Sequence, residues 1–470
     1  MPSMSMKACF LLLVLVLAAP QPQSILFSEA LHITEYLDYS VLHTDELPED
    51  LSAYNVIVIS TPLELYEEHQ IQALKTFVES GGGLMLLAEE NNKDGTTLVL
   101  NQIAEEFSIT FNSDRIYDNT LYVDHTSWVL LEKFPSHPVF QGITDIVYTS
   151  GCSVEGGGLV LKSSEHAFAE KYDGVVTYIK GEFPPCMVFS EVGEGRIFAC
   201  GDKELFDTYL SLKDNTLFAL NVFDWLAGNP DRISKRFVDK EKALQTISET
   251  ESALRTATEN GLKELFLNTV TNVETLLSEA KNLYDVYQFA VAHQKAIQAK
   301  QTLADGQDKA QEMVDSGIQT AEQCLSRIEK GAKEYLPSQF EAAHYYLQQV
   351  DQEKTYAKKM EKADKALELC EEINTSLEGA AEKEINVATE KVSSFKGLFG
   401  RKSHHSARIF LEYAEESYDK ENFGDALVYA EQSQIYSDRA SKEQKKDYIL
   451  VAGIGLLVVF VGYIYVRKWK

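Results

Sequence analysis

The sequence feature that most constrains this chain is a long apolar run near its C-terminus. Tyr448 to Val466 contains 19 residues without a charge, and the basic stretch Arg467 to Lys470 follows it. As a helix rising 1.5 Å per residue, the run extends about 28 Å, close to the hydrocarbon thickness of a bilayer. A helix of a soluble protein needs a polar face toward water, and this run has none. The sequence therefore predicts a transmembrane helix over residues 448–466 and a cytoplasmic tail over 467–470.

A second apolar run, Ala8 to Ala19, lies near the N-terminus after a single lysine. Its length, and the small and polar residues that follow it, are typical of a secretory signal, which we predict over residues 1–24. Ala19 and Ser24 are alternative cleavage positions, and an uncleaved anchor is another interpretation. Basic residues flank the C-terminal run on both sides, so the flanking charge does not indicate which end of the helix faces the cytoplasm. The predicted signal does indicate it, because it would export the chain that follows it. We therefore expect a single-pass protein of the cell membrane with residues 25–447 outside the cytoplasm.

Charge and cysteine usage exclude several classes of protein. Forty-four Lys and Arg residues against 72 Asp and Glu give a net charge of −28, which repels phosphate backbones, so we expect no nucleic-acid partner. The cysteines beyond the predicted signal are odd in number and irregularly spaced, and they predict neither a zinc site nor a disulfide scaffold. Cys200 lies in an apolar run, whereas Cys152 and Cys186 lie in loop-like contexts where pairing stays open. No metal or other cofactor is expected.

Residues 25–229 alternate strand-like and helix-like segments. Asn55–Ile59 predicts a strand, and the continuously apolar run Leu84–Ala88 is typical of a strand buried on both faces of a parallel sheet. Between them, Glu67–Ser80 has apolar residues at helical spacing and ends at three glycines. Asn215–Leu226 is the predicted helix that closes the domain. Such alternation implies right-handed β-α-β crossovers, and we predict an α/β fold with a doubly wound, flavodoxin-like, mostly parallel sheet.

Several motifs in this region occur in a fixed order. They are the opening segment Ile25–His32, the helix-to-strand turn Phe77–Leu84, the segment His137–Ile143, and Gly195–Asp202 followed by Asn221–Gly228. Together they resemble the class I glutamine amidotransferase-like superfamily, and within it a non-amidotransferase branch that includes gliding-motility and intraflagellar-transport components. Enzymes of that superfamily place a nucleophilic cysteine at a strand-to-helix elbow. This chain has Glu89, Glu90 and Asn91 there, so the resemblance implies a non-catalytic domain and we do not expect an enzyme.

Polar residues follow the predicted strands, where open parallel sheets bind ligands. The ligand-binding candidates follow the first, third and last strands: Glu29 and His32, then Glu89, Glu90 and Asn91, then Asp202 and Glu204. Carboxylates with one imidazole can hold a hard cation or recognise an amine. The other interpretation is that acidic loop residues occur by chance in a chain of this charge. A hydrolase that uses Glu29, His32 and Asp202 is an alternative function.

Residues 230–447 have a helical composition, with one proline after Pro230, and contain an internal repeat. Residues of the same kind recur every 67 positions. An aromatic residue recurs at Phe289, Tyr356 and Phe423, and a small residue recurs at Ala296, Ala363 and Ala430. The last copy, Ala407–Ala440, resembles a tetratricopeptide unit, whose period is about 34 residues. A repeat array and an antiparallel bundle both fit, and either forms a spacer between the α/β domain and the membrane. Within it, Ser394–Ser406 is predicted to be a basic loop that breaks the helices.

These features predict a membrane-anchored extracytoplasmic binding or scaffold protein, integral to the membrane with a single pass. We expect the helical region to bind a protein partner. The alternative is an accessory subunit of a membrane transporter or surface assembly, in which the helices make the main contact.

Overall fold

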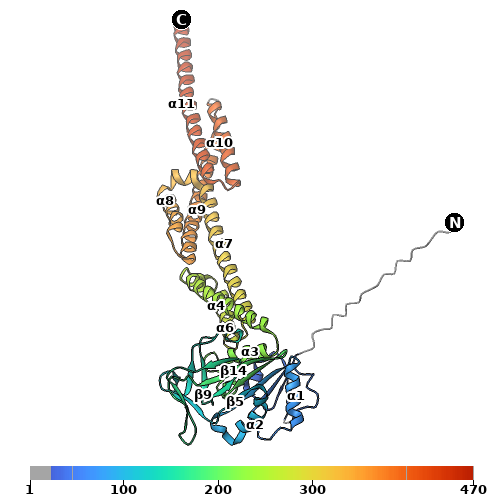
Figure 1. Ribbon diagram of the computed structural model, residues 1–470. Helices are drawn as coiled ribbons and strands as arrows, with labels where there is room; N and C mark the ends of the chain where they lie inside the picture. Colours follow the sequence, from blue (N-terminus) through green and yellow to red (C-terminus); the bar gives the residue numbers. More distant parts are fainter. Residues whose placement is uncertain (1–22, 45, 398–399, 469–470) are drawn as a thin grey trace, which may run out of the picture. The chain divides into compact units, whose positions relative to one another are not determined.

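The computed structural model describes residues 23–44, 46–397 and 400–468 (Figure 1). The chain divides into two compact units, Met1–Lys242 and Ala243–Lys470. The first carries the strands and the second is helical, which confirms the predicted order of an α/β region followed by a helical region. The division falls within helix α4 (Pro230–Glu259), which begins at the predicted domain boundary.

A seven-stranded sheet forms the centre of the first unit, in the order β11-β14-β15-β4-β3-β1-β2. Neighbouring strands from β15 through β2 are parallel, whereas β14 pairs antiparallel with both β15 and β11. Strands β3 and β4 are buried at every position, as their continuous apolar sequences predict. The strands are β1 (Ser24–Phe27), β2 (Ser40–His43), β3 (Val56–Ser60), β4 (Gly83–Leu87), β11 (Leu159–Lys162), β14 (Pro185–Val192) and β15 (Gly195–Cys200).

Three smaller antiparallel sheets contain the other described strands of this unit, in the orders β10-β5, β13-β12-β6 and β7-β8-β9. Apart from β8 and β9, which contain apolar runs, most of these strands are short and partly exposed, so their sequences mark them only weakly. They are β5 (Ile109–Phe111), β6 (Arg115–Asp118), β7 (Tyr122–Val123), β8 (His125–Leu131), β9 (Ile146–Thr149), β10 (Val154–Gly156), β12 (Ala167–Glu170) and β13 (Val176–Tyr178).

Helices cover both faces of the seven-stranded sheet. Helices α1 (Glu68–Glu79) and α2 (Thr96–Ala104) share one apolar cluster with strand residues such as Ile57 and Leu84. The alternate strand residues point to the other face, where helix α3 (Asn215–Leu226) packs with aromatic contacts. The ring centroids of Phe27 and Phe223 are 5.7 Å apart, and those of Phe198 and Phe218 are 6.1 Å apart.

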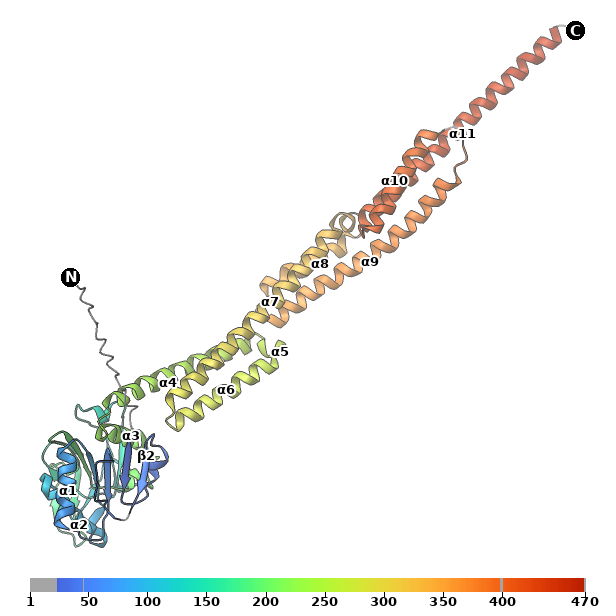
Figure 2. The ribbon, with the colours of Figure 1, turned by 90° about the vertical axis from the view of Figure 1, so that its right-hand side faces the viewer.

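The second unit is built from helical hairpins, in which α6 packs with α7, α8 with α9, and α10 with α11 (Figure 2). After α4, its helices are α5 (Leu262–Leu265), α6 (Leu267–Asp285), α7 (Phe289–Tyr335), α8 (Pro337–Gln349), α9 (Tyr356–Ser394), α10 (Arg401–Asp419) and α11 (Phe423–Lys468). The three long helices therefore begin at Phe289, Tyr356 and Phe423, the aromatic residues that recur every 67 positions. Their small counterparts are fully buried: Ala296, Ala363 and Ala430.

Close contacts join the long helices to one another. Cys324 on α7 and Cys370 on α9 form a disulfide, with Cα atoms 6.2 Å apart, which the irregular cysteine spacing does not predict. Gly331 on α7 faces Gly424 on α11, because a Cβ added to Gly331 would lie 2.3 Å from the Cα of Gly424. The two backbones approach this closely only because neither residue has a side chain.

The structure describes the predicted transmembrane helix but not most of the predicted signal. Among the described residues, one helix is long and apolar enough to cross a membrane, and it is α11 over Phe423–Arg467. Every residue from Tyr448 to Val466 is exposed. Of the predicted signal, residues 1–22 lie outside the described residues, and Ser24 is the first residue of β1. The predicted loop over Ser394–Ser406 is too long, because α9 includes Ser394 and α10 begins at Arg401.

Candidate functional site

The carboxyl ends of four parallel strands meet at one edge of the large sheet. Strands β15, β4, β3 and β1 are neighbours in that order, and the chain places β2 on the far side of β1. The strands that follow β1 in the chain therefore lie on opposite sides of it, β2 on one side and β3 on the other, and the strand order reverses at β1. In open parallel sheets, ligands bind outside the carboxyl ends of the strands beside such a reversal.

Lys203, directly after β15, is the centre of the polar contacts at this edge. Its Nζ lies 3.3 Å from Glu29 Oε1 and 3.7 Å from Glu89 Oε1, so the ends of β1, β4 and β15 share one cation. Ser60, at the end of β3, donates its hydroxyl to Glu29 Oε1 at 2.5 Å. Burial opposes the charged form of Lys203, but Glu29 and Glu89 outweigh it and raise the pKa of the ammonium. The structure therefore joins two of the predicted residues through a lysine that the sequence interpretation missed.

Glu90, Asn91 and His32 bind partners outside this cluster. Glu90 Oε1 lies 2.7 Å from Arg115 Nη2, and the Asn91 N–H donates to the Asp114 carbonyl at 2.8 Å. Asn91 adopts a left-handed conformation with φ of 54°, which asparagine tolerates better than most residues. His32 is exposed, and its Nδ1 lies 2.6 Å from Asp207 Oδ1. These contacts lie beside the sheet edge, and the buried Oδ1 of Asn91 has no hydrogen-bond partner within the described part of the chain.

Asp202 is buried and faces strand β9. Its carboxylate accepts hydrogen bonds from the Thr149 N–H and hydroxyl and from the Leu205 N–H, the last at 3.3 Å. Burial raises the pKa of Asp202 to about 8, and Glu204, the first residue of a short 3-10 helix (Glu204–Phe206), adds to the effect. Among the described residues, no hydrogen bond or ion pair joins Glu29, His32 and Asp202 to one another.

The thiols of the α/β unit are not available as nucleophiles. Cys152, Cys186 and Cys200 are free and buried, and burial raises the pKa of each thiol above its usual value. Cys186 lies inside strand β14 and not in a loop, which corrects the expectation from its proline-rich context. Cys152 and Cys186 do not pair with each other. The buried hydroxyl of Tyr148 donates to the Cys152 carbonyl at 2.5 Å, so this cluster belongs to the core.

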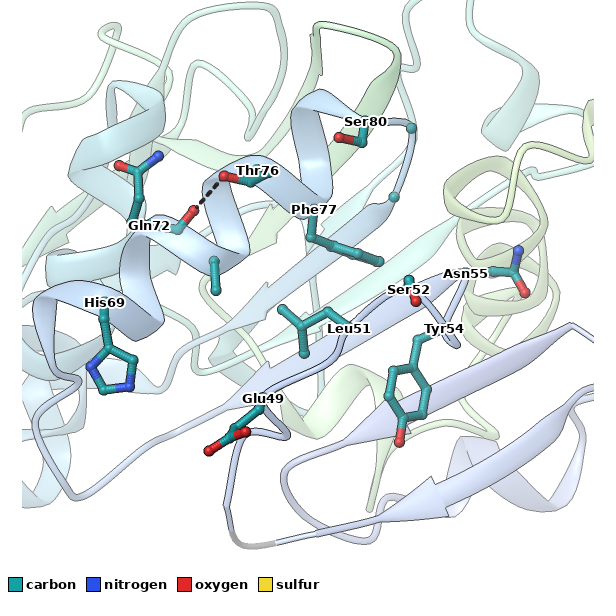
Figure 3. A pocket seen from close by; sticks show the side chains of 13 residues that line it. Glu49, Leu51, Ser52, Tyr54, Asn55, His69, Gln72, Thr76, Phe77 and Ser80 are labelled. Atoms are coloured by element: carbon teal, nitrogen blue, oxygen red, sulfur yellow. Dashed lines mark hydrogen bonds between the residues drawn. The ribbon is translucent and has the colours of Figure 1, made fainter.

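A cavity of about 620 Å³ lies at the opposite edge of the sheet (Figure 3). Asn55 and Gly82, which precede β3 and β4, line it together with side chains of α1. Leu51 and Phe77 supply apolar contacts, and His69 stands at its rim, where its Nδ1 lies 3.0 Å from Glu67 Oε2. None of the predicted ligand-binding residues lines this cavity. Within the described part of the chain, no group of three or more His, Cys, Asp or Glu side chains could hold a metal ion.

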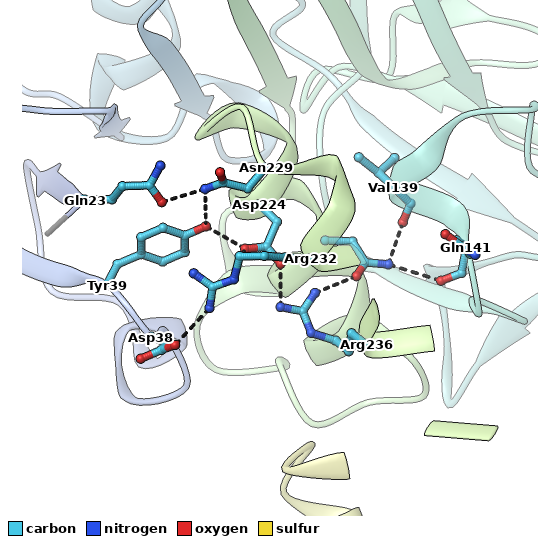
Figure 4. Close-up of polar contacts among 10 residues, drawn as sticks. Gln23, Asp38, Tyr39, Val139, Gln141, Asp224, Asn229, Arg232 and Arg236 are labelled. Atoms are coloured by element: carbon cyan, nitrogen blue, oxygen red, sulfur yellow. Dashed lines mark hydrogen bonds and ion pairs between the residues drawn. The ribbon is translucent and has the colours of Figure 1, made fainter. Parts of the chain in front are cut away.

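A buried ion-pair network holds the first turns of α4 against α3 (Figure 4). Asp224 is buried; its Oδ2 lies 2.5 Å from Arg236 Nη2, and its Oδ1 lies 3.4 Å from Arg232 Nε. The Tyr39 hydroxyl donates to Asp224 Oδ1 at 2.5 Å. Burial and the neighbouring Asp224 carboxylate raise the pKa of Tyr39, so this hydroxyl keeps its proton. In the sequence, the only indication of this network is that the charged residue Asp224 lies inside the otherwise mostly apolar segment Asn215–Leu226.

Two comparisons with known proteins concern the first unit. Residues 36–128 match the family model of the IFT52 GIFT domain. The solved structure described as the mmIFT52 N-terminal domain is 19% identical, covers 43% of this chain and 97% of its own, and has a TM-score of 0.37. Cytoplasmic Protein STM1381 from Salmonella typhimurium LT2 is 12% identical, with coverages of 43% and 99% and a TM-score of 0.29. A ThuA-like protein from Parabacteroides merdae is 14% identical, with coverages of 44% and 90% and a TM-score of 0.29. No curated protein sequence matches significantly.

These findings correct the family that the sequence motifs indicated. The prediction of a class I glutamine amidotransferase-like domain fused to a tetratricopeptide-like region is wrong, because the matching family model is that of the IFT52 GIFT domain. Turns such as Phe77–Leu84 occur in many parallel α/β domains and do not specify one family. In the helical unit, α7 alone has 47 residues, which is longer than a whole tetratricopeptide unit of about 34.

Proposed function

We propose that the chain is a membrane-anchored extracytoplasmic protein with a binding or scaffold role. The observation that carries this proposal is the exposed apolar segment of α11, Tyr448–Val466. An uncovered helical surface of this length has no polar face, and water is a poor solvent for it. A bilayer satisfies the segment along its whole length, because the helix already bonds its own backbone groups.

One observation and one prediction support an oxidising compartment for the residues ahead of this segment. The disulfide between Cys324 and Cys370 is of a kind that persists in exported proteins and is rare in the cytosol. The predicted signal would deliver the chain there. Gln23 and Ser24 belong to the folded unit, since Gln23 Oε1 accepts from Asn229 Nδ2 at 2.5 Å and the Ser24 N–H donates to Asn55 Oδ1 at 3.0 Å. We therefore favour cleavage at Ala19 over cleavage at Ser24.

The α/β unit supports binding rather than chemistry. The parallel order from β2 to β15, with helices on both faces, is that of a doubly wound, flavodoxin-like sheet. At its carboxyl edge, Lys203 is shared between Glu29 and Glu89, and the more exposed Lys93 also pairs with Glu89. The cysteines are buried and protonated. A ligand ammonium would pair with the carboxylates that Lys203 shares between them, so we propose recognition of a cationic group there.

A role as an accessory subunit is the second candidate, and one surface of the helical unit favours it. Four aromatic rings gather on α10 and α11, where the ring centroids of Phe410 and Tyr436 are 5.3 Å apart and those of Tyr413 and Tyr429 are 5.7 Å apart. Tyr413 is 49% exposed and the nearby Ile435 is 56% exposed. Aromatic side chains of this kind are enriched where proteins bind one another. Repeated hairpins would supply a rigid frame for such a contact.

The anchoring proposal is tested with three forms of the chain in the same cells: the full chain, a chain ending at Asp447, and the full-length variant Leu456→Arg/Val459→Arg. The full chain should stay with membranes in alkaline carbonate, and protease added to intact cells should digest its α/β unit. The shortened chain should be secreted, and the variant should lose stable insertion because two charges at mid-span are costly. A full chain that carbonate extracts, or an α/β unit protected in intact cells, would sink the proposal.

A further inference from the structure

A cluster of basic residues surrounds α11 just before the apolar segment. Its exposed members come from two segments distant in the sequence: Lys396, Arg401 and Lys402, and then Lys442, Lys445 and Lys446. We call these six residues the basic collar. Among the described residues, none of the six forms an ion pair with an acidic side chain. The chain as a whole carries a net charge of −28, so this local excess of positive charge runs against its average.

Packing between α10 and α11 brings the two segments together. The Ser403 hydroxyl donates to Glu443 Oε2 at 2.8 Å. A Cβ added to Gly400 would lie 2.5 Å from the Ala440 carbonyl oxygen, and one added to Gly397 would lie 2.5 Å from the Gln444 side chain. Figure 2 shows the first turn of α10 beside α11 at the point where α11 continues alone. The collar is therefore fixed by the fold and is not a property of one flexible stretch.

The collar lies at the level that lipid headgroups would occupy. Gln444, Glu443 and Ala440 precede Tyr448 by four, five and eight residues, so at 1.5 Å per residue the packed segments lie about 6 to 12 Å from the apolar segment along the helix. That distance is about one Debye length at physiological ionic strength, over which a charged surface still acts on a cation. The nearby acidic groups are Glu443, which binds Ser403 and Arg439, and Asp447.

We propose that the basic collar binds anionic phospholipid headgroups on the side of the membrane that faces the α10-α11 hairpin. The proposal rests on the membrane anchoring proposed above. Apolar insertion holds α11 in the bilayer whatever the lipid charge, and the collar then selects lipids whose phosphates are not neutralised by an amine. Each lysine or arginine near an anionic surface contributes about a fivefold preference, reduced by salt. Arg401 and Lys402 are also the first two residues of α10, whose first N–H groups point toward the same side and favour anions.

The test measures which lipids remain with the full-length protein. The chain is purified in detergent micelles that contain equal amounts of phosphatidylcholine and phosphatidylglycerol, and mass spectrometry gives the ratio of the two bound lipids. The collar variant is Arg401→Gln/Lys402→Gln/Lys442→Gln/Lys446→Gln. The matched control replaces four exposed lysines outside the collar: Lys263→Gln, Lys309→Gln, Lys354→Gln and Lys358→Gln. Arg467, beyond the apolar segment, stays in every form.

We expect the wild type and the control to retain phosphatidylglycerol at least about fivefold over phosphatidylcholine, with the preference lost at high salt. The collar variant should retain the two lipids nearly equally. A wild-type ratio equal to that of the micelle, or an equal loss in the control, would overturn the collar proposal. Flotation of the full chain with pure phosphatidylcholine vesicles separates the two proposals, because failure to float there would instead count against membrane anchoring.

Discussion

The two units differ in the size of the side chains that fill their cores. The largest fully buried side chains all belong to the α/β unit, among them Phe27, Tyr148, Phe198 and Phe218. The helical unit buries mainly small residues along its long helices, as Ala296, Ala363 and Ala430 illustrate. A wide space between sheet and helix needs large side chains, whereas close helix pairs leave room only for small ones. Substitutions that remove side-chain volume should therefore lower the stability of the α/β unit most, and substitutions that add volume should lower that of the helical unit most.

Removing a core ring should produce the largest loss in the α/β unit. Phe198 packs against Phe189, Phe206 and Phe218 between the sheet and α3. Phe198→Ala should lower the free energy of unfolding by about 3–5 kcal/mol, because the cavity cannot collapse fully. Chemical denaturation measures this change. Tyr172→Ala, at a residue 94% exposed, is the control and should change stability by less than about 0.5 kcal/mol. Similar effects for both variants would remove the core argument.

Breaking the buried ion pair should rank next. Asp224→Asn leaves Arg236 buried without its carboxylate and should cost about 3 kcal/mol. Asp38 also binds Arg232, at 3.0 Å, but its side chain is 94% exposed. Asp38→Asn is therefore the matched control, and it should leave the unfolding transition nearly unchanged. Equal losses for the two variants would show that burial is not what gives the Asp224 network its strength.

A reductant should destabilise the helical unit and leave the α/β unit unchanged, because the disulfide joins two helices of the helical unit. Cys324→Ser/Cys370→Ser should lower the stability of the helical unit by about 2–4 kcal/mol, and dithiothreitol should do the same to the wild type. Amide hydrogen exchange should place the loss in α7 and α9. Exchange in the large sheet should be unaffected, because Cys152, Cys186 and Cys200 are free. Faster exchange in the sheet after reduction would contradict the assignment of these thiols.

Asp202 should give the α/β unit a distinct pH dependence. Burial raises its pKa to about 8 from 3.8, so between these values the folded chain holds a proton that the unfolded chain has lost. Stability therefore falls as pH rises through this window, by no more than about 1.4 kcal/mol per pH unit. Asp202→Asn resembles the protonated acid and should lose this slope. Urea titrations at pH 5 and pH 8 measure it. An unchanged slope in the variant would mean that other carboxyl groups produce it.

Much of the architecture could be predicted from the sequence, because long apolar runs and long repeats are strong local signals. Val56–Ser60 and Gly83–Leu87 are strands, and the aromatic residues at Phe289, Tyr356 and Phe423 mark the starts of three helices. The candidate site was less predictable. Glu29 and Glu89 meet only through Lys203, 174 residues from Glu29 along the chain. The Cys324–Cys370 pair likewise depends on the packing of two helices, which spacing alone does not reveal.

The smallest effects should show the contrast between the units most directly, because two helix glycines should respond with opposite signs. Gly379 on α9 has nothing within 4 Å of an added Cβ, so Gly379→Ala should stabilise the chain by about 1 kcal/mol through helix propensity. Gly331 has the Cα of Gly424 only 2.3 Å from an added Cβ. An added methyl group there would push α7 away from α11, and this cost should exceed the gain in helix propensity. Gly331→Ala should therefore lower the stability by about 1 kcal/mol. Thermal unfolding of the two variants measures both signs. If both glycines gave a gain, the helical unit would tolerate added volume, and small side chains would not set its helix spacing.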